Sequence, residues 1–255
     1  MQFAAHVTNR IAPSSPALSL HFARGMRPNV EAILRLAARP AESTAFSISL
    51  MPEPDEGWLE LLAMGLTFDL HGLEPFKPEK IDPGHHYFGL AQSDYVEGPD
   101  ALRLSPGPHL SGASTMLPVL RLLAGLGAEL ARLPGLMAIG WSTAGTRMAP
   151  SYFMSSVRAW LAGGAFPALG LTGLTIRDDG GVESEGFALF AGHEIVVEPL
   201  PEEAVADRAK LAARAMHHIV HAGAGQIGQV TDSAGRPLHA DLAANGGVLR
   251  LWRSL

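Results

Sequence analysis

The stretch STMLPVLRLLAGLGAELARLPGLMAIGW, residues Ser114–Trp141, carries the strongest structural signal in the chain. Its first part predicts an amphipathic helix, because apolar residues recur every three or four positions and form one stripe. The stripe consists of Val119, Leu123, Leu126, Leu130 and Leu133. Pro134-Gly135 favours the end of this helix, and the apolar run Met137–Trp141 is typical of a strand that is buried on both faces. We therefore expect a helix followed directly by a buried strand.

The residues after that strand extend the pair into an α-β-α-β unit. Pro150 favours the start of a second helix, and Gly163-Gly164 favours its end. The run Leu169–Ile176 then predicts a strand, and Asp178–Gly181 has the composition of a hairpin turn. We expect this unit to form the centre of the fold.

Both flanks of the unit contain further elements. Alternation of apolar and polar residues predicts a half-buried strand at residues 45–51. An apolar run predicts a short helix at Gly57–Met64, and a stripe of apolar and small residues predicts a long helix from Glu202 to Gly223. Further strands are expected at 67–71, 86–91, 101–104, 226–231 and 248–252. Because strands outnumber helices, the sequence predicts an α+β protein with a mostly antiparallel sheet and helices packed on one face, and an α/β arrangement is the main alternative.

The predicted domain organisation separates residues 1–44 from residues 45–255. The first segment is expected to be an N-terminal arm with one short helix. Pro13 and Pro16 favour a loosely ordered start, and Asn29 favours the N-cap of the helix. The remaining residues are expected to form a single α+β domain.

Composition excludes several classes of function. The 255 residues carry a net charge of −6, which argues against a nucleic-acid partner because phosphate binding needs a concentrated basic patch. The absence of cysteine excludes thiol catalysis, thiolate metal sites and disulfides, and is consistent with a reducing cytoplasm. The most apolar stretch, Leu117–Trp141, is interrupted by charges and by Pro134, so a membrane span is not expected. We predict a cytoplasmic protein.

The sequence IVHAGAGQIGQV contains Gly223-x-Gly225-x-x-Gly228, which resembles a dinucleotide fingerprint. That fingerprint works because a strand delivers the glycines to the start of a helix, whose amides hold the pyrophosphate. Here the glycines follow a predicted helix, so the order is reversed. We interpret them as a helix C-cap and a turn, and we predict no cofactor.

Three histidines near the end of the long predicted helix form a candidate metal site. His217 and His221 are one helical turn apart and could together bind a divalent ion. The motif HExxH is missing, and Lys210 and Arg214 on the same face would repel a cation. We therefore predict that the two residues, with His218, belong to a solvated basic face. Contact with a partner is the second interpretation, and metal binding is the third.

The loop Ser142–Ala149 is where we first expect a binding surface, because it follows the carboxyl end of a buried strand. The candidate binding residues around it are Trp141, Arg147, Tyr152 and Phe153. Packing in the core is the alternative role for Trp141 and Phe153, since large aromatic side chains more often fill cores.

Four segments in the second half of the chain resemble one bacterial family. They are AIGW, SYFMSSVRAWL, GGAFPALGL and SEGFALFAGHEIVVEPL, between Ala138 and Leu200. The pattern resembles domain-of-unknown-function family 4261, best over residues 137–230 and more loosely over 45–252. The comparable positions are Gly186, Phe190, Gly192, Glu194, Ile195 and Gly228. The chain departs from the family pattern at Ser184-Glu185 and at Ala191. The resemblance implies no known activity, cofactor or catalytic residue.

Taken together, these features predict a non-catalytic protein-binding molecule, an interaction or immunity-type module, for which a homodimer is left open. No serine lies in a G-x-S-x-G elbow, and Glu183 and Glu185 on a hairpin more often face solvent than form a catalytic pair. The alternative is a small-molecule hydrolase or another enzyme with a site built from dispersed residues. Those residues would be Arg147, Glu185, His193 and Glu194.

Overall fold

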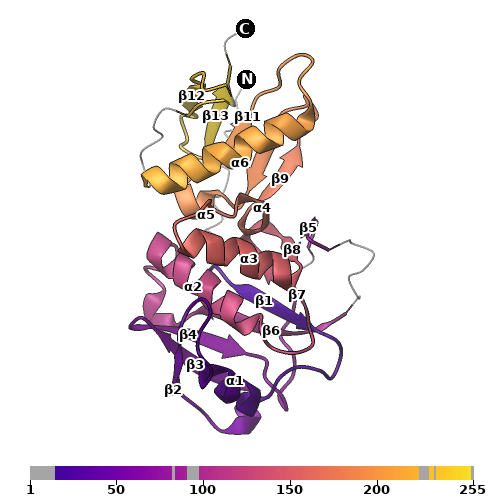
Figure 1. Cartoon of the computed structure of the whole chain (residues 1–255), viewed down its shortest axis with the longest axis vertical. Helices are drawn as coiled ribbons and strands as arrows, with labels where there is room; N and C mark the ends of the chain where they lie inside the picture. The colour runs from indigo at the N-terminus through magenta and orange to yellow at the C-terminus, as the bar shows by residue number, and fades with distance from the viewer. Residues whose placement is uncertain (1–14, 82–83, 91–97, 224–229, 233, 254–255) are drawn as a thin grey trace, which may run out of the picture.

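The chain folds around two β-sheets that lie one above the other along the long axis of the molecule (Figure 1). The computed structural model describes residues 15–81, 84–90, 98–223, 230–232 and 234–253. With 31% helix and 30% strand, and with mostly antiparallel pairing in both sheets, the protein is an α+β protein as predicted. The sequence predicts a single sheet, whereas the structure divides the strands between two.

The larger sheet has eight strands, and all neighbouring pairs except β5–β8 are antiparallel. The order across it is β2 (Ser47–Leu50), β3 (Trp58–Ala63), β4 (Leu66–His71), β6 (Asp100–Pro106), β1 (Leu18–Phe22), β7 (Leu136–Trp141), β8 (Thr146–Met148) and β5 (His86–Phe88).

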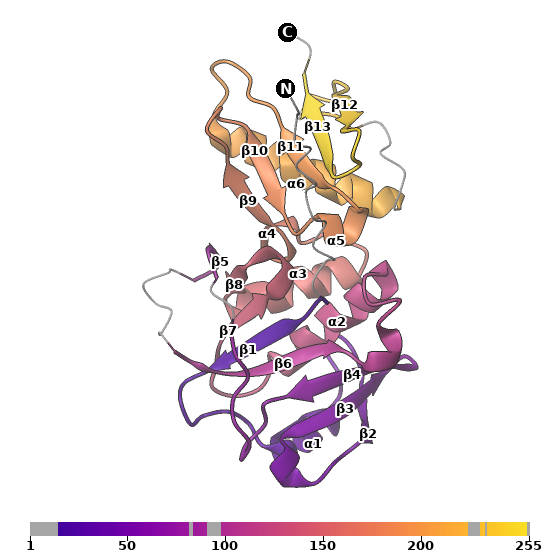
Figure 2. The ribbon, with the colours of Figure 1, turned by 180° about the vertical axis from the view of Figure 1, so that it is seen from behind.

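Three helices cover one face of the larger sheet, and the view from behind shows the strands in front of them (Figure 2). They are α1 (Val30–Ala37), α2 (Leu117–Leu130) and α3 (Pro150–Leu161). Helix α2 packs on β6 and β1, and α3 packs on β7. The predicted leucine stripe is confirmed, because Leu123, Leu126 and Leu130 have no exposed surface. Among the described residues, 3₁₀ turns connect elements of this half at Pro54–Glu56, Pro108–Leu110 and Ser142–Ala144.

The smaller sheet has five strands and one long helix, α6 (Val205–Ala222), which packs on β10 and β11. Of its pairs, β11–β13 is parallel and the others are antiparallel. Two single-turn helices, α4 (Ala168–Leu171) and α5 (Ala188–Ala191), lie between this sheet and the larger one (Figure 1). The strand order is β12 (His239–Leu242), β13 (Val248–Trp252), β11 (Glu194–Val197), β10 (Val182–Glu185) and β9 (Gly173–Ile176).

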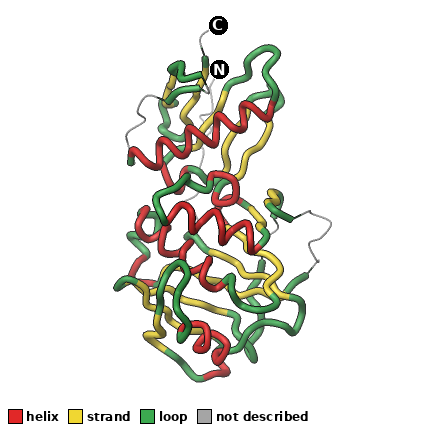
Figure 3. The backbone as a smooth tube through the Cα atoms, in the orientation of Figure 1, coloured by secondary structure: helices red, strands yellow, loops and turns green. Residues whose placement is uncertain are grey.

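The predicted α-β-α-β unit exists, but it crosses between the sheets. Helix α2, strand β7 and helix α3 belong to the larger half, whereas β9 belongs to the smaller sheet (Figure 3). The predicted strand Leu169–Ile176 is wrong at its start, since residues Ala168–Leu171 form the turn α4 and only Gly173–Ile176 form the strand.

The short helix predicted at Gly57–Met64 is wrong, because these residues form strand β3. Its side chains alternate, with Leu59, Leu61 and Ala63 buried and their neighbours half-exposed. A two-residue turn joins β3 to β4: Met64 and Gly65 have φ angles of 49° and 81°, the left-handed pair that a tight hairpin needs. Pairing with β4 and β2 therefore overrides the helical preference of the leucines.

Strand β1 lies in the middle of the larger sheet, which differs from the arm predicted for residues 1–44. It pairs with β6 on one side and β7 on the other, and Leu18, Leu20 and Phe22 are fully buried. The short helix of that segment is present as α1, and the Asn29 side chain accepts a hydrogen bond from the amide of Ala32. The helix and the strand are thus parts of the larger half. The single domain predicted for residues 45–255 stays a prediction.

The two sheets meet at a buried cluster of rings that we call the aromatic seam: Trp141, Trp160, Phe166, Phe187 and Phe190. Ring centroids of Phe166 and Phe190 are 4.8 Å apart, and those of Trp141 and Phe190 are 6.1 Å apart. Trp141 and Trp160 come from the larger half, while Phe187 and Phe190 come from the segment between β10 and β11. One hydrophobic core therefore runs through both halves.

None of the helices within the described residues combines the length and the apolar character that crossing a membrane requires.

Candidate functional site

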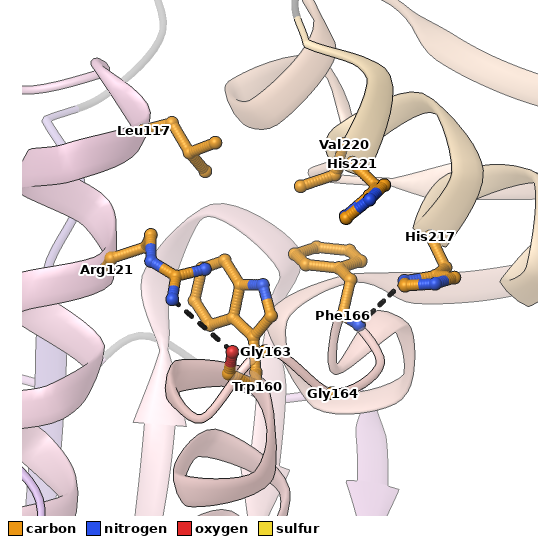
Figure 4. Close-up of a pocket in the computed structure, with 9 residues that line it drawn as sticks. All are labelled: Leu117, Arg121, Trp160, Gly163, Gly164, Phe166, His217, Val220 and His221. Atoms are coloured by element: carbon orange, nitrogen blue, oxygen red, sulfur yellow. Dashed lines mark hydrogen bonds between the residues drawn. The ribbon is translucent and has the colours of Figure 1, made fainter.

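Two adjoining hollows lie along helix α6, where it faces the helices of the larger half. The first, which we call the α2–α6 pocket, has a volume of about 280 Å³ (Figure 4). Leu117 and Arg121 approach it from α2, and Val220 and His221 approach it from α6. Trp160, Phe166, His217 and the glycines 163 and 164 complete its lining.

The second hollow, which we call the α3–α6 groove, has a volume of about 730 Å³. Tyr152, Ser156 and Ala159 line it from α3, and the connection Ala165–Leu169 forms its floor. On its other side lie four residues of α6: Lys210, Ala213, Arg214 and His217. The two hollows share Phe166 and His217, so they adjoin along one side of α6.

The charges around the two hollows have one sign. Within the described residues, neither lining includes an aspartate or a glutamate, although the chain as a whole has more acidic than basic residues. Arg121 lies 4.7 Å from the Trp160 ring, in cation–π contact, and donates to the carbonyls of Trp160 and Leu161. Lys210 pairs with Asp207, which lies outside the lining. An apolar floor with cations at its edge is suited to a ligand that is partly apolar and partly anionic.

His217 connects helix α6 to the floor of the two hollows. Its Nδ1 accepts a hydrogen bond of 3.2 Å from the amide of Phe166, so this nitrogen carries no proton in the arrangement shown (Figure 4). The rings of His217 and His221 are 5.9 Å apart. The predicted solvated face is therefore wrong for His217, which is half-buried, and it holds for His218 and His221, which are exposed. The connection between α3 and α4 is the reason, because Phe166 lies there and covers one edge of the predicted polar face.

Of the four predicted binding residues, only Tyr152 lines the groove. Its hydroxyl donates to the carbonyl of Leu169 at 2.8 Å, and burial raises its pKa. Trp141 and Phe153 have no exposed surface and pack in the core, which is the alternative role that their size suggested. Arg147 is 3% exposed. It is next to Thr146 in β8, so the two side chains point to opposite faces of the sheet, and the Thr146 hydroxyl donates to the carbonyl of Gly170.

Arg147 belongs to a buried polar group inside the larger half. It donates to the carbonyl of Thr146, and it leaves no room for a Cβ atom on Gly140, which would lie 2.6 Å from its Nη1. Nearby, the Ser19 hydroxyl is hydrogen-bonded to Nε2 of His21 at 2.7 Å. Burial, aided by the charge of Arg147, lowers the pKa of His21 to about 3. His21 is therefore neutral at physiological pH, and the group is part of the interior.

Glu194, one of the dispersed residues of the enzyme alternative, organises the turn before α5. Its carboxylate accepts hydrogen bonds from the amides of Gly186, Phe187 and Ala188, and from the Ser184 hydroxyl at 2.5 Å. A Cβ atom on Gly186, which has a φ of 82°, would lie 2.8 Å from Cβ of Ala144 in the larger half. Several positions of the family-like motif thus shape a turn that docks on the larger sheet.

The other members of the enzyme alternative lie in different surroundings. His193 is buried, and its ring meets the Phe187 ring edge-on at 6.2 Å. Glu185 instead contacts two imidazoles from the larger half, those of His85 and His86. We call these three residues the His–Glu bridge. Arg147 lines a small hollow beside Lys80 and Arg103, and Glu185, His193 and Glu194 are not in that lining.

The glycine motif after α6 lies mostly outside the described residues, which stop at Gly223 and resume at Val230. Gly223 itself follows the last residue of α6 with a φ of 95°, and its amide donates to the carbonyl of Ile219. It therefore ends a helix, which is the C-cap role predicted for it. The strand predicted at 226–231 also falls largely in that gap.

Arg121 and Phe166 are site residues that the sequence analysis missed. Arg121 is one of two charged residues in the apolar helix α2, and such a residue more often faces solvent. Phe166 offers a weak signal, since it is one large ring in the small-residue segment GGAFPALGL. Neither residue indicates that α2 and α6 line one pocket, because these two helices are far apart in the chain.

Comparison with known proteins found no family model, no curated protein and no solved structure that matches the chain. The resemblance to family 4261 therefore stays a prediction, and the site is interpreted from its own geometry.

Proposed function

We propose that the protein is a non-catalytic, cytoplasmic binding protein, an interaction or immunity-type module. In this proposal the α3–α6 groove and the α2–α6 pocket receive a protein partner through one of its segments, which carries apolar side chains beside acidic ones. The observation that carries the proposal is the composition of the two linings. Apolar and small residues form the floor, while the flanking charged side chains are basic and, among the described residues, none is acidic.

The size of the groove supports this assignment. A volume of about 730 Å³ lies within the range of roughly 300–1,000 Å³ that is typical of small-molecule pockets, so the groove has room for side chains of a bound segment. The groove opens along α6, so an extended or helical segment could lie in it with its ends free. Exposed Arg214 and Lys210 would meet acidic side chains of that segment, and electrostatic complementarity of this kind favours correct partners over wrong ones.

The proposal can be tested with a random peptide library displayed on phage. Peptides selected on the full chain are expected to combine Asp or Glu with apolar residues. Their Kd, measured by fluorescence anisotropy, is expected to rise about tenfold with Arg214→Glu, which replaces an attraction by a repulsion. A similar rise is expected with Ala213→Trp, because the larger side chain fills the groove.

Arg39→Glu is the matched control. Arg39 is exposed beyond the end of α1, away from both hollows, and the substitution makes the same change of charge. Peptide affinity is expected to be unchanged. Selection of no binder, or of binders that tolerate Arg214→Glu and Ala213→Trp as well as Arg39→Glu, would overturn the proposed function.

A further inference from the structure

The His–Glu bridge places three metal-binding atoms at one point between the two sheets. Nε2 of His85 and Nε2 of His86 lie 2.8 Å and 3.0 Å from the same oxygen, Oε2 of Glu185. All three atoms lie within 4.8 Å of one another. Ligands in a tetrahedral zinc site, each about 2.0–2.1 Å from the ion, are separated by roughly 3.3 Å. Small side-chain movements would therefore bring the three atoms around an ion.

The backbone holds both imidazoles in place. The amides of His85 and His86 each donate to the carbonyl of Gly145, at 2.9 Å and 3.3 Å, and β5 pairs with β8 from His86 onwards. The two rings are 4.5 Å apart and inclined by 52°. These contacts bring two adjacent residues, which would point to opposite faces of a regular strand, onto one carboxylate.

Two glycines, one from each half of the molecule, make room for the rings. A Cβ atom on Gly145 would lie 2.3 Å from Cε1 of His85, and one on Gly173 would lie 2.3 Å from Cδ2 and Nε2 of His86. Gly173 is also the residue that pairs with Glu185 across β9 and β10. Any larger residue at either position would displace an imidazole. The positions of the two imidazoles therefore depend on Gly145 and Gly173 as well as on the ligand atoms.

We propose that His85, His86 and Glu185 bind one divalent first-row transition-metal ion. Two imidazoles and one carboxylate form the ligand set of open zinc and iron(II) sites, whereas Ca²⁺ and Mg²⁺ prefer oxygen ligands. The His85 side chain is 54% exposed and that of Glu185 is 40% exposed, so further positions on the ion are open to water. The ion replaces the protons that the two imidazoles donate to Glu185, and it joins β5 of the larger sheet to β10 of the smaller one.

This inference is independent of the proposed function, since the bridge and the two hollows share no residue. It also differs from the weak metal candidate His217 and His221. Among the described residues, the only group of three or more suitable ligands is the bridge.

Zinc binding to the full chain can be measured by competition with a chromophoric chelator. The wild-type protein is expected to bind one Zn²⁺, with affinity reduced at least tenfold by Glu185→Gln and by His86→Ala. Gly173→Ala removes no ligand but moves the His86 ring, so a comparable loss is expected. Co²⁺ is a second probe, because its visible spectrum reports nitrogen and oxygen ligation directly.

Two controls separate the bridge from other histidines and from general effects of added methyl groups. His221→Ala should leave Zn²⁺ affinity unchanged, and so should Gly112→Ala, where an added Cβ atom meets nothing within 4 Å. Circular dichroism would confirm that each variant is folded. Absence of stoichiometric Zn²⁺ binding by the wild-type protein, equal affinity in Glu185→Gln, or loss of binding in His221→Ala would overturn the proposal.

Discussion

The aromatic seam and the His–Glu bridge join the same two sheets by opposite chemistry. In the seam, rings from both halves are buried against one another, and Trp141 and Phe187 have no exposed surface. In the bridge, one carboxylate from β10 meets two imidazoles near β5, and the groups are partly open to water. Apolar burial contributes free energy in proportion to area, whereas exposed ion pairs contribute about 1 kcal/mol or less.

The comparison indicates which contact holds the halves together and which one can respond to solution conditions. The seam should determine how firmly the sheets are joined, because burial of its rings contributes most of the free energy of this contact. That free energy does not depend on protonation. The bridge adds little free energy by itself, but its Glu185 carboxylate can gain a proton, and the three side chains offer atoms that can bind an ion.

Removal of a ring from the seam should have the largest effect. Phe187→Ala is expected to lower the free energy of unfolding by about 3–5 kcal/mol, because it leaves a cavity between Phe166 and His193. Urea unfolding followed by tryptophan fluorescence would measure it. Leu50→Ala, at a 49% exposed side chain on the edge strand β2, should change stability by only about 0.5 kcal/mol. Equal effects of the two substitutions would contradict the assigned role of the seam.

As the pH falls, the protein should lose stability through His21, in the interior of the larger half, before it loses stability through the His–Glu bridge. The pKa of His21 is lowered to about 3 in the folded state, so the unfolded chain binds the extra proton first, near its ordinary value of about 6.5. The contribution of neutral His21 to the free energy of unfolding is fully present above pH 6.5. As the pH falls below this value, the free energy of unfolding should decrease by about 1.4 kcal/mol for each pH unit, until about pH 3.

Urea unfolding between pH 7 and pH 4 would measure this loss in the wild-type protein and in His21→Gln, which should show a shallower dependence. His218→Gln, at an exposed histidine of α6, is the control and should keep the wild-type slope. Parallel slopes in the wild-type protein and His21→Gln would show that His21 is not the group responsible.

Removal of the charge at the bridge should have the smallest effect. Burial raises the pKa of Glu185, but hydrogen bonds and charge from His85 and His86 outweigh it, so the net shift is downward. The folded state therefore favours the ionised carboxylate. The stabilisation that the Glu185 carboxylate provides is present above its pKa in the unfolded chain. It is lost as the pH falls through its lower pKa in the folded protein.

With no metal added, Glu185→Gln should lower the free energy of unfolding at pH 7 by less than about 1 kcal/mol, since the side chain is 40% exposed. The difference from the wild-type protein should shrink as the pH falls through the lowered pKa of Glu185 in the folded protein. A difference at pH 7 as large as that of Phe187→Ala would show that the bridge, and not the seam, dominates the junction.

Regular elements with local signals could be predicted from the sequence. The leucine stripe of α2 has a helical period, and Asn29 caps α1. Strand β3 could not be predicted, because its hairpin turn is Met64-Gly65 and lacks the asparagine or aspartate that usually marks such turns. In β1, LSLHF does alternate, but the prolines before it favour an arm, and both faces of the strand prove to be covered.

The sites were harder to predict than the elements, because their parts are distant in the chain. Glu185 lies 100 residues after His85, and no local pattern indicates that they touch. The α2–α6 pocket likewise needs Arg121 and His221 to line one cavity, which depends on how the two halves pack together. Local propensity fixes elements, whereas a site of this kind follows from the packing of the whole chain.

The central position of β1 has a consequence for synthesis of the protein. This strand is made long before both of its neighbours, β6 and β7. Until β6 emerges, Leu18, Leu20 and Phe22 have no strand to pair beside, and until β7 emerges one edge of β1 stays open to other contacts. The nascent chain should therefore need shielding over most of its first half, and pauses in translation before Trp141 should lower the yield of native protein.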